Sequence, residues 1–140
     1  MKSSGTSGPG APRAVVAGHG EFAAGMISAV QLISGRGDVF RGLSNAGLDA
    51  GGLLAAMDEA VAAHAARVVF TDLPAGSCTI AARRLAHSRP ALTVVTGANL
   101  SMLLDYALNG EDGVAAAAHA AARGREAIEV TPSVEGSGAD

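Results

Sequence analysis

The chain alternates between short apolar runs and longer segments in which apolar residues recur every three or four positions. Short runs of this kind predict buried strands, and the three-to-four spacing predicts amphipathic helices. The predicted strands cover residues 13–18, 38–43, 67–72 and 92–96, with a further short strand signal at 127–130. The predicted helices cover residues 21–34, 51–66, 77–87, 100–108 and 111–123.

The order of these elements predicts an α/β fold. Strands that alternate with helices usually form a mainly parallel sheet covered by helices on both faces. Right-handed crossovers limit the topology to a single open, doubly wound sheet. We expect one domain over residues 13–130, preceded by a disordered Gly/Ser/Pro-rich leader at 1–12 and followed by a flexible tail at 131–140.

Composition narrows the class of protein. With 140 residues, one domain is the natural expectation, and 49% hydrophobic residues are enough for a core. Aromatic residues make up only 3%, so we expect a core of small aliphatic side chains. The net charge of −3 and the absence of a basic stripe argue against a nucleic-acid partner. A single cysteine, Cys78, excludes an internal disulfide and a cysteine-cluster metal site.

Two features of the chain favour a cytoplasmic protein. Its apolar stretches are far shorter than the roughly 18 residues that cross a bilayer. The first ten residues also lack the apolar core of a signal peptide. We therefore expect the protein in the cytoplasm.

Three predicted strands end in polar or glycine-rich sequence. The first ends in Gly18-His19-Gly20, the third runs into Thr71-Asp72 and on to Gly76-Ser77, and the fourth is followed by Asn99. The carboxyl ends of parallel strands meet at one edge, where ligands bind in open α/β sheets. We therefore expect the site residues at one crevice: His19, Asp72 and Ser77, with Thr71 and Asn99 at its periphery.

These residue types suit phosphoryl transfer. A carboxylate such as Asp72 beside the His19 imidazole fixes its tautomer and leaves the other ring nitrogen free as nucleophile, base or metal ligand. Ser77 opens a predicted helix, and the backbone N–H groups of a helix N-terminus bind anions. A histidine nucleophile, an orienting carboxylate and an anion site together indicate transfer through phosphohistidine.

Plainer roles exist for the same residues. Asp72 could cap the following turn, and Ser77 and Asn99 could be ordinary helix N-caps. Cys78 more often packs as a small apolar residue than serves as a nucleophile. It would, however, sit at a helix N-terminus, which can lower the pKa of a thiol. A small hydrolase that uses Cys78 or Ser77 with His19 is therefore a rival interpretation.

A dinucleotide site is a weaker alternative. Residues 18–23 fit the G-x-G-x-x-G/A pattern, with Asp38 downstream as a possible ribose ligand. However, Asp38 falls at the start of its predicted strand, whereas a ribose-binding acid belongs at the far end. The bulky His19 would also occupy the phosphate turn, so we set this interpretation aside.

Three blocks of the chain resemble a known family. Residues 15–23 are similar to its phosphorylation-site strand and turn, 69–77 to its Asp-x-x-Gly-Gly-Ser/Thr-Pro loop, and 94–104 to its Thr-Gly-x-Asn-Leu-Pro-Met-Leu segment. The family is the mannose-type enzyme IIA component of the phosphoenolpyruvate-dependent sugar phosphotransferase system, which includes mannose, fructose, sorbose and N-acetylgalactosamine members. Ala75, Cys78, Ile80 and Ser101 depart from the usual glycine, proline, asparagine and proline.

The resemblance implies a phosphotransferase in which His19 is the phosphoacceptor and Asp72 orients its ring. It implies that Gly20, Gly76 and Ser77 hold the phosphoryl oxygens and that neither a metal nor another cofactor is needed.

The resemblance also implies partners. The donor would be the histidine-containing phosphocarrier HPr and the recipient an enzyme IIB component, which phosphorylates sugar entering through membrane IIC and IID components. A homodimer is implied in which the strand at 127–130 pairs, antiparallel, with the partner's sheet. A regulatory module that uses the same phosphohistidine to switch binding is the alternative function.

Overall fold

The computed structural model of the chain describes residues 12–109, 111 and 113–134, so most of the expected leader and tail lies outside the described residues. Four strands and five helices follow one another in the predicted alternation, with one short 3-10 helix. The strands are β2 (Ala14–Gly18), β3 (Phe40–Ser44), β4 (Val68–Thr71) and β5 (Thr93–Val95). The helices are α1 (Phe22–Ser34), η1 (Gly37–Val39), α2 (Ala50–His64), α3 (Ser77–Ser88), α4 (Leu100–Leu108) and α5 (Val114–Glu126).

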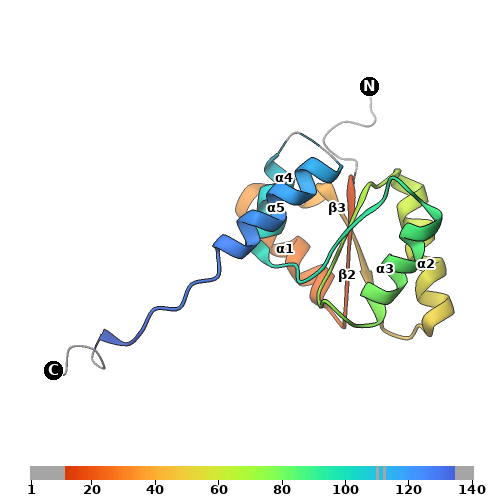
Figure 1. Ribbon diagram of the computed structural model, residues 1–140, viewed down its shortest axis with the longest axis horizontal. Helices are drawn as coiled ribbons and strands as arrows, with labels where there is room; N and C mark the ends of the chain where they lie inside the picture. The colour runs from red at the N-terminus through yellow and green to blue at the C-terminus, as the bar shows by residue number, and fades with distance from the viewer. Residues whose placement is uncertain (1–11, 110, 112, 135–140) are drawn as a thin grey trace.

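The strands form one parallel sheet in the order β3-β2-β4-β5, which confirms the predicted fold class. The chain steps from β2 to β3 on one side and then crosses back over β2 to reach β4. Because crossovers are right-handed, this reversal puts α1 on one face and α2 and α3 on the other. Helices α4 and α5 join α1, as Figure 1 shows. The strand order therefore reverses between β2 and β4, the place where ligands bind in such sheets.

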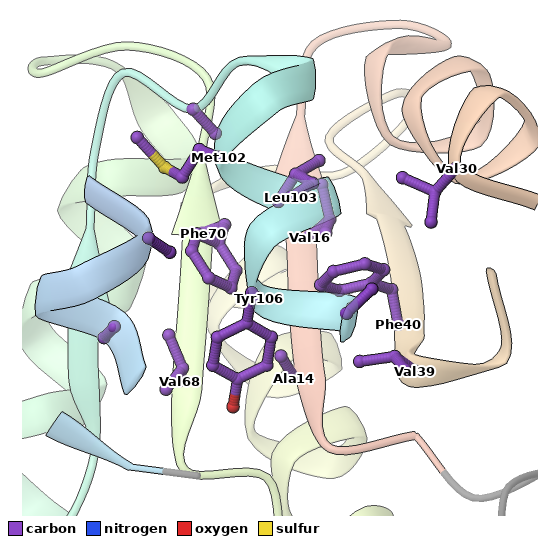
Figure 2. Close-up of a cluster of buried hydrophobic side chains, with 14 of the residues drawn as sticks. Ala14, Val16, Val30, Val39, Phe40, Val68, Phe70, Met102, Leu103 and Tyr106 are labelled. Atoms are coloured by element: carbon purple, nitrogen blue, oxygen red, sulfur yellow. The ribbon is translucent and has the colours of Figure 1, made fainter. Parts of the chain in front are cut away.

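Alternate strand residues build two apolar layers. On the face covered by α2 and α3, the layer is aliphatic, with Val15 and Val69 packed against Leu53 and Met57. The opposite layer centres on an aromatic cluster of Phe40, Phe70 and Tyr106 (Figure 2), whose ring centroids lie 5.1 to 6.1 Å apart. The chain has only three phenylalanines and one tyrosine, so most of its aromatic side chains lie in this one layer.

Several element boundaries differ from the sequence prediction by two or three residues, and two of these differences have a clear physical cause. The second strand begins at Phe40 and not at Asp38, because residues 37–39 form a 3-10 turn in which Asp38 pairs with Arg36 at 3.2 Å. Helix α5 continues three residues beyond the predicted end, to Glu126. Its last turn carries Arg123 and Arg125, whose charges favour a helix C-terminus.

The predicted fifth strand is absent from the sheet of the single chain. Residues 127–130 follow α5 without strand pairing, and the chain runs away from the body of the molecule in Figure 1. The side chains of Ile128 and Val130 are 72% and 89% exposed. A strand needs a hydrogen-bonded neighbour, and the backbone N–H groups of Ala127 and Ile128 instead bond back to α5. Exchange of this segment in a dimer stays a prediction.

Replacing Phe70 by alanine should destabilise the protein by about 3–5 kcal/mol, the usual loss for a buried aromatic side chain whose cavity does not collapse. Phe70 is fully buried between Phe40 and Tyr106, so both would lose a packing partner. Urea unfolding followed by circular dichroism measures the change. Leu32→Ala is the control, because Leu32 is 88% exposed. A loss below about 1 kcal/mol for Phe70→Ala would contradict the central role of this cluster.

Candidate active site at the carboxyl end of the sheet

The reversal between β2 and β4 brings His19 and Asp72 into direct contact. Each residue follows its strand immediately, and Ala17 and Thr71 are paired neighbours in the two strands. One carboxylate oxygen of Asp72, Oδ2, lies 2.8 Å from Nδ1 of His19 and accepts the His19 backbone N–H at 2.9 Å. The imidazole is 48% exposed and the carboxylate only 11%. The ring is thus held through Nδ1, and Nε2 is left for a reacting group.

The electrostatics of the pair favour an ionised Asp72. Burial acts to raise the pKa of Asp72, but the side-chain and backbone hydrogen bonds from His19 and the charge of its ring act against it, and the net pKa lies below its usual value. An ionised carboxylate only accepts hydrogen bonds, so Nδ1 of His19 is the donor. In the neutral ring the lone pair then sits on Nε2, where a nucleophile needs it.

Asn45 holds the His19 turn from the neighbouring strand end. Its backbone N–H donates to Gly18 O at 3.2 Å, and its side-chain oxygen accepts the Gly20 N–H at 3.3 Å. Gly20 has φ +55°, a left-handed conformation that favours glycine. The family resemblance implies that Gly20 binds the phosphoryl oxygens. In this structure its N–H donates to the side chain of Asn45. Sequence reasoning missed Asn45, although it follows β3 and so marks a further strand end at the same edge.

Buried hydroxyl groups fix the loop that carries Asp72. Thr71 is fully buried, and its hydroxyl lies 2.6 Å from the hydroxyl oxygen of Thr79 in α3. Thr79 donates its own proton to the carbonyl of Leu73, so Thr71 must be the donor between the two threonines. Thr71 thus supports the loop through its hydrogen bond to Thr79. Thr79 falls in the helix predicted over residues 77–87, but its sequence context gives no sign of this role.

The start of α3 lies beside the imidazole. A Cβ placed on Gly76 would lie 3.4 Å from Cε1 of His19, so the ring packs against this glycine. Ile80 makes the first i→i−4 bond of the helix, to Gly76 O, which leaves the preceding N–H groups at the open end of α3. Such an end carries partial positive charge and favours anions. Ser77, exposed in the first turn, adds a hydroxyl to this position.

Asn99 takes part in helix packing, and its side-chain hydrogen bonds go to α4 and α5 and not to the His19–Asp72 pair. Its side-chain oxygen accepts the Met102 N–H at 3.0 Å, and its amide donates to Gly124 O at 2.9 Å. The plain N-cap interpretation is confirmed, and the second bond ties α4 to α5. The structure therefore brings together His19, Asp72 and Gly76, with Ser77 adjoining, while Asn99 serves the neighbouring helices.

Two departures from the family pattern have clear structural outcomes. Cys78 is fully buried, and its pKa is raised, first by burial and then by the negative charge of Asp72. Cys78 thus packs in the apolar core as a small side chain, and the lowered pKa that a helix start can cause is not found, which argues against a hydrolase based on this thiol. Ala75 has a negative φ, so the missing glycine there causes no backbone strain.

A second histidine has similar bonding but a different setting. His119 in α5 lies 2.8 Å through Nδ1 from Oδ2 of Asp105 in α4, and its side chain is 54% exposed. Both residues lie inside helices, and neither of them directly follows a strand or opens a helix. Hydrogen bonding alone therefore does not distinguish His19. The distinction is the strand reversal and the adjacent N-terminus of α3. Within the described ranges, no group of three or more His, Cys, Asp or Glu side chains is arranged to hold a metal ion.

Residues 13–131 match the EIIA-man family model, described as the PTS (phosphotransferase system) fructose IIA component. The chain belongs to this family of IIA components. The match includes the whole sheet, both turns of the candidate site and all five helices. No curated protein sequence matches the chain significantly.

Solved structures of similar proteins share the fold. A mannose/sorbose-specific IIA subunit from Enterococcus faecalis is 23% identical, with a TM-score of 0.76 over 88% of this chain and 96% of that one. An EIIA component from Streptococcus agalactiae is 23% identical, with a TM-score of 0.74 over 84% and 95%. A PTS IIA protein associated with a fucose utilization operon in Streptococcus pneumoniae is 20% identical, with a TM-score of 0.74 over 86% and 93%. At these identities the likeness establishes the fold. In the part of the chain that the structure describes, no helix has the length and apolarity to span a bilayer.

The pKa of Asp72 predicts an acid-dependent contribution to stability. Because its folded-state pKa is lowered, the contribution is present above the unfolded-state pKa of about 3.9 and is lost as the pH falls through the folded-state value. Asp72→Asn cannot titrate, so its free energy of unfolding should fall less than that of the wild type between about pH 5 and 3. Urea unfolding at each pH measures this, with Asp58→Asn as a surface-carboxylate control. Parallel pH profiles for wild type and Asp72→Asn would contradict it.

Proposed function

We propose that this member of the IIA family is a cytoplasmic phosphohistidine carrier, which accepts a phosphoryl group on His19 from phosphorylated HPr and passes it to an enzyme IIB component. The observation that carries the proposal is the asymmetry of the His19 ring. Nδ1 is bound by Asp72, while Nε2 is left for a reacting group and Cε1 packs on Gly76, next to the start of α3.

Each group then has a defined part in the transfer. The Nε2 lone pair of His19 attacks the phosphorus in line, a new N–P bond forms, and the N–P bond of the donor histidine breaks with its electron pair returning to the donor ring. Positive charge develops on the His19 ring and is stabilised by Asp72. The phosphoryl oxygens gain the partial positive charge of the α3 N-terminus and the hydroxyl of Ser77. Transfer to the IIB component is the same step in reverse with another acceptor.

The wider pathway follows from the family. A IIA component works in phosphotransferase-system sugar transport, so the phosphoryl group would finally reach a sugar that enters through membrane IIC and IID components. The chemistry at His19 does not depend on the sugar, because the sugar never meets this chain. The polar groups of the site accordingly serve the phosphoryl group and the two partner proteins.

Phosphorylation should depend on His19. Incubation with phosphoenolpyruvate, enzyme I and HPr should add one acid-labile phosphoryl group, detected by intact mass. His19→Gln should abolish it, and His119→Gln, which removes the other histidine bonded to a carboxylate, should leave it unchanged. Asp72→Asn should slow the transfer by about 10-fold or more, because the ring loses its anionic partner. An acid-labile phosphate that survives His19→Gln would rule the assignment out.

We also propose that two copies of the chain exchange their C-terminal segments. Strand β5 is an edge of the sheet, and a groove of about 380 Å³ beside it is lined by β5 and the two residues that follow it, together with residues of α4 and α5 and Ile128. Ile128, Val130 and Val134 are exposed apolar residues on the segment that follows. A strand from a second copy would satisfy the open edge and cover such residues.

Sedimentation equilibrium tests the exchange. The wild type should be a dimer, and the double change Ile128→Asp with Val130→Asp should weaken dimerisation at least 10-fold by placing charge in the paired segment. Leu32→Asp, an equally exposed apolar position on α1, is the control. A monomeric wild type, or a double variant as dimeric as the wild type, would contradict the proposal.

A further inference from the structure

Transfer between two protein histidines requires that the donor protein cover His19. The donor nitrogen must approach within bonding reach of Nε2, and a specific interface buries roughly 800 Å² on each partner. This area is much larger than His19 and Asp72 together. The surface around the pair must therefore contribute most of the contact, and its chemistry selects the partner.

Exposed apolar side chains flank the His19–Asp72 pair on the α3 side. Leu73 is 48% exposed, and its Cδ1 lies 3.8 Å from the position of a Cβ on Gly76, where His19 also packs. Ile80 lies in the first turn of α3 and is 58% exposed. Apolar side chains gathered beside a reactive group indicate a surface made for another protein.

A small pocket continues this surface between α2 and α3. It has a volume of about 130 Å³ and is lined by Ala50, Leu54, Ser77, Ile80, Ala81 and Arg84. Ser77 also belongs to the open end of α3, so the pocket adjoins the position proposed for the phosphoryl group. Most of its lining is aliphatic, and its size suits one apolar side chain.

Arg84 supplies an unmatched charge at the same pocket. It lies four residues after Ile80 and so on the same side of α3. Within the described part of the chain, Arg84 is exposed and forms neither a hydrogen bond nor an ion pair. An unpaired cation beside an apolar pocket favours a partner that presents a carboxylate.

We propose that Leu73, Ile80, the α2–α3 pocket and Arg84 form the docking surface for the phosphohistidine carrier protein that loads His19. An apolar side chain of the carrier fills the pocket, and a carboxylate of the carrier pairs with Arg84. The inference rests on the proposed function. It adds that the carrier approaches over the start of α3, with Ile80 and Arg84 determining its affinity and taking no part in the chemistry.

Initial rates of phosphoryl transfer from phosphorylated HPr, measured over a range of HPr concentrations, test the docking surface. Ile80→Asp and Arg84→Glu should each lower kcat/KM about 10-fold, the effect of about 1.4 kcal/mol of lost binding, with kcat unchanged. The deficit of Arg84→Glu should shrink at high salt, because salt screens the charge pair. Leu32→Asp and Arg83→Glu are the controls, since they make the same changes away from the pocket.

A small phosphoryl donor separates this proposal from the proposed function. Phosphoramidate needs no docking surface, so it should label His19 at equal rates in wild type, Ile80→Asp and Arg84→Glu, which also shows that the site is intact. Failure of both donors to label wild-type His19 would overturn the proposed function. Normal labelling by phosphoramidate together with wild-type kcat/KM for HPr in both variants would overturn the docking surface alone. A defect confined to transfer from His19 to the IIB component would also overturn it, because the surface would then belong to the recipient.

Discussion

The crossing of the chain from β3 over β2 to β4 is the constraint on which the site depends. It makes β2 and β4 neighbours, although His19 and Asp72 are 53 residues apart in the sequence. His19 and Asp72 each follow their strand directly. The hydrogen bond between them therefore forms only because the two strands end in register. The same reversal divides the helices between the two faces and so determines which apolar residues share a layer. Packing and chemistry thus have a common geometric origin.

The His19–Asp72 pair is held by residues that take no part in the proposed transfer. Asn45 braces the His19 turn, and Thr79 braces the Asp72 loop through the carbonyl of Leu73. Burial of the Thr71 and Thr79 hydroxyls makes their bonds expensive to break, since an unsatisfied buried hydroxyl costs about 1–3 kcal/mol. The pair is therefore preorganised, as the proposed transfer by positioning and electrostatics would require.

Much of the fold could be predicted because its signals are local. Apolar periodicity located all four strands of the sheet and all five helices, and the alternation of strands with helices indicated a parallel, doubly wound sheet. The predictions that differ from the structure concern segments whose conformation depends on a contact with another residue or strand. Asp38, predicted in a strand, lies in a 3-10 helix and pairs with Arg36. Residues 127–130 have the composition of a strand but pair with no strand of their own chain.

The features of the site also fall into those that the sequence predicts and those that depend on the fold. From the residues alone it follows that a glycine-flanked histidine and an aspartate end buried strands, and that a helix begins shortly after the aspartate. The folded chain adds that Nδ1 of His19 bonds to Asp72 and that Asn45 and Thr79 brace the two loops. It also shows that Cys78 is buried with a raised pKa and that Asn99 bonds within α4 and α5. The physical reason is that strand ends are encoded by adjacent residues, whereas ring orientation, burial and hydrogen-bond partners arise from contacts between segments that only folding brings together.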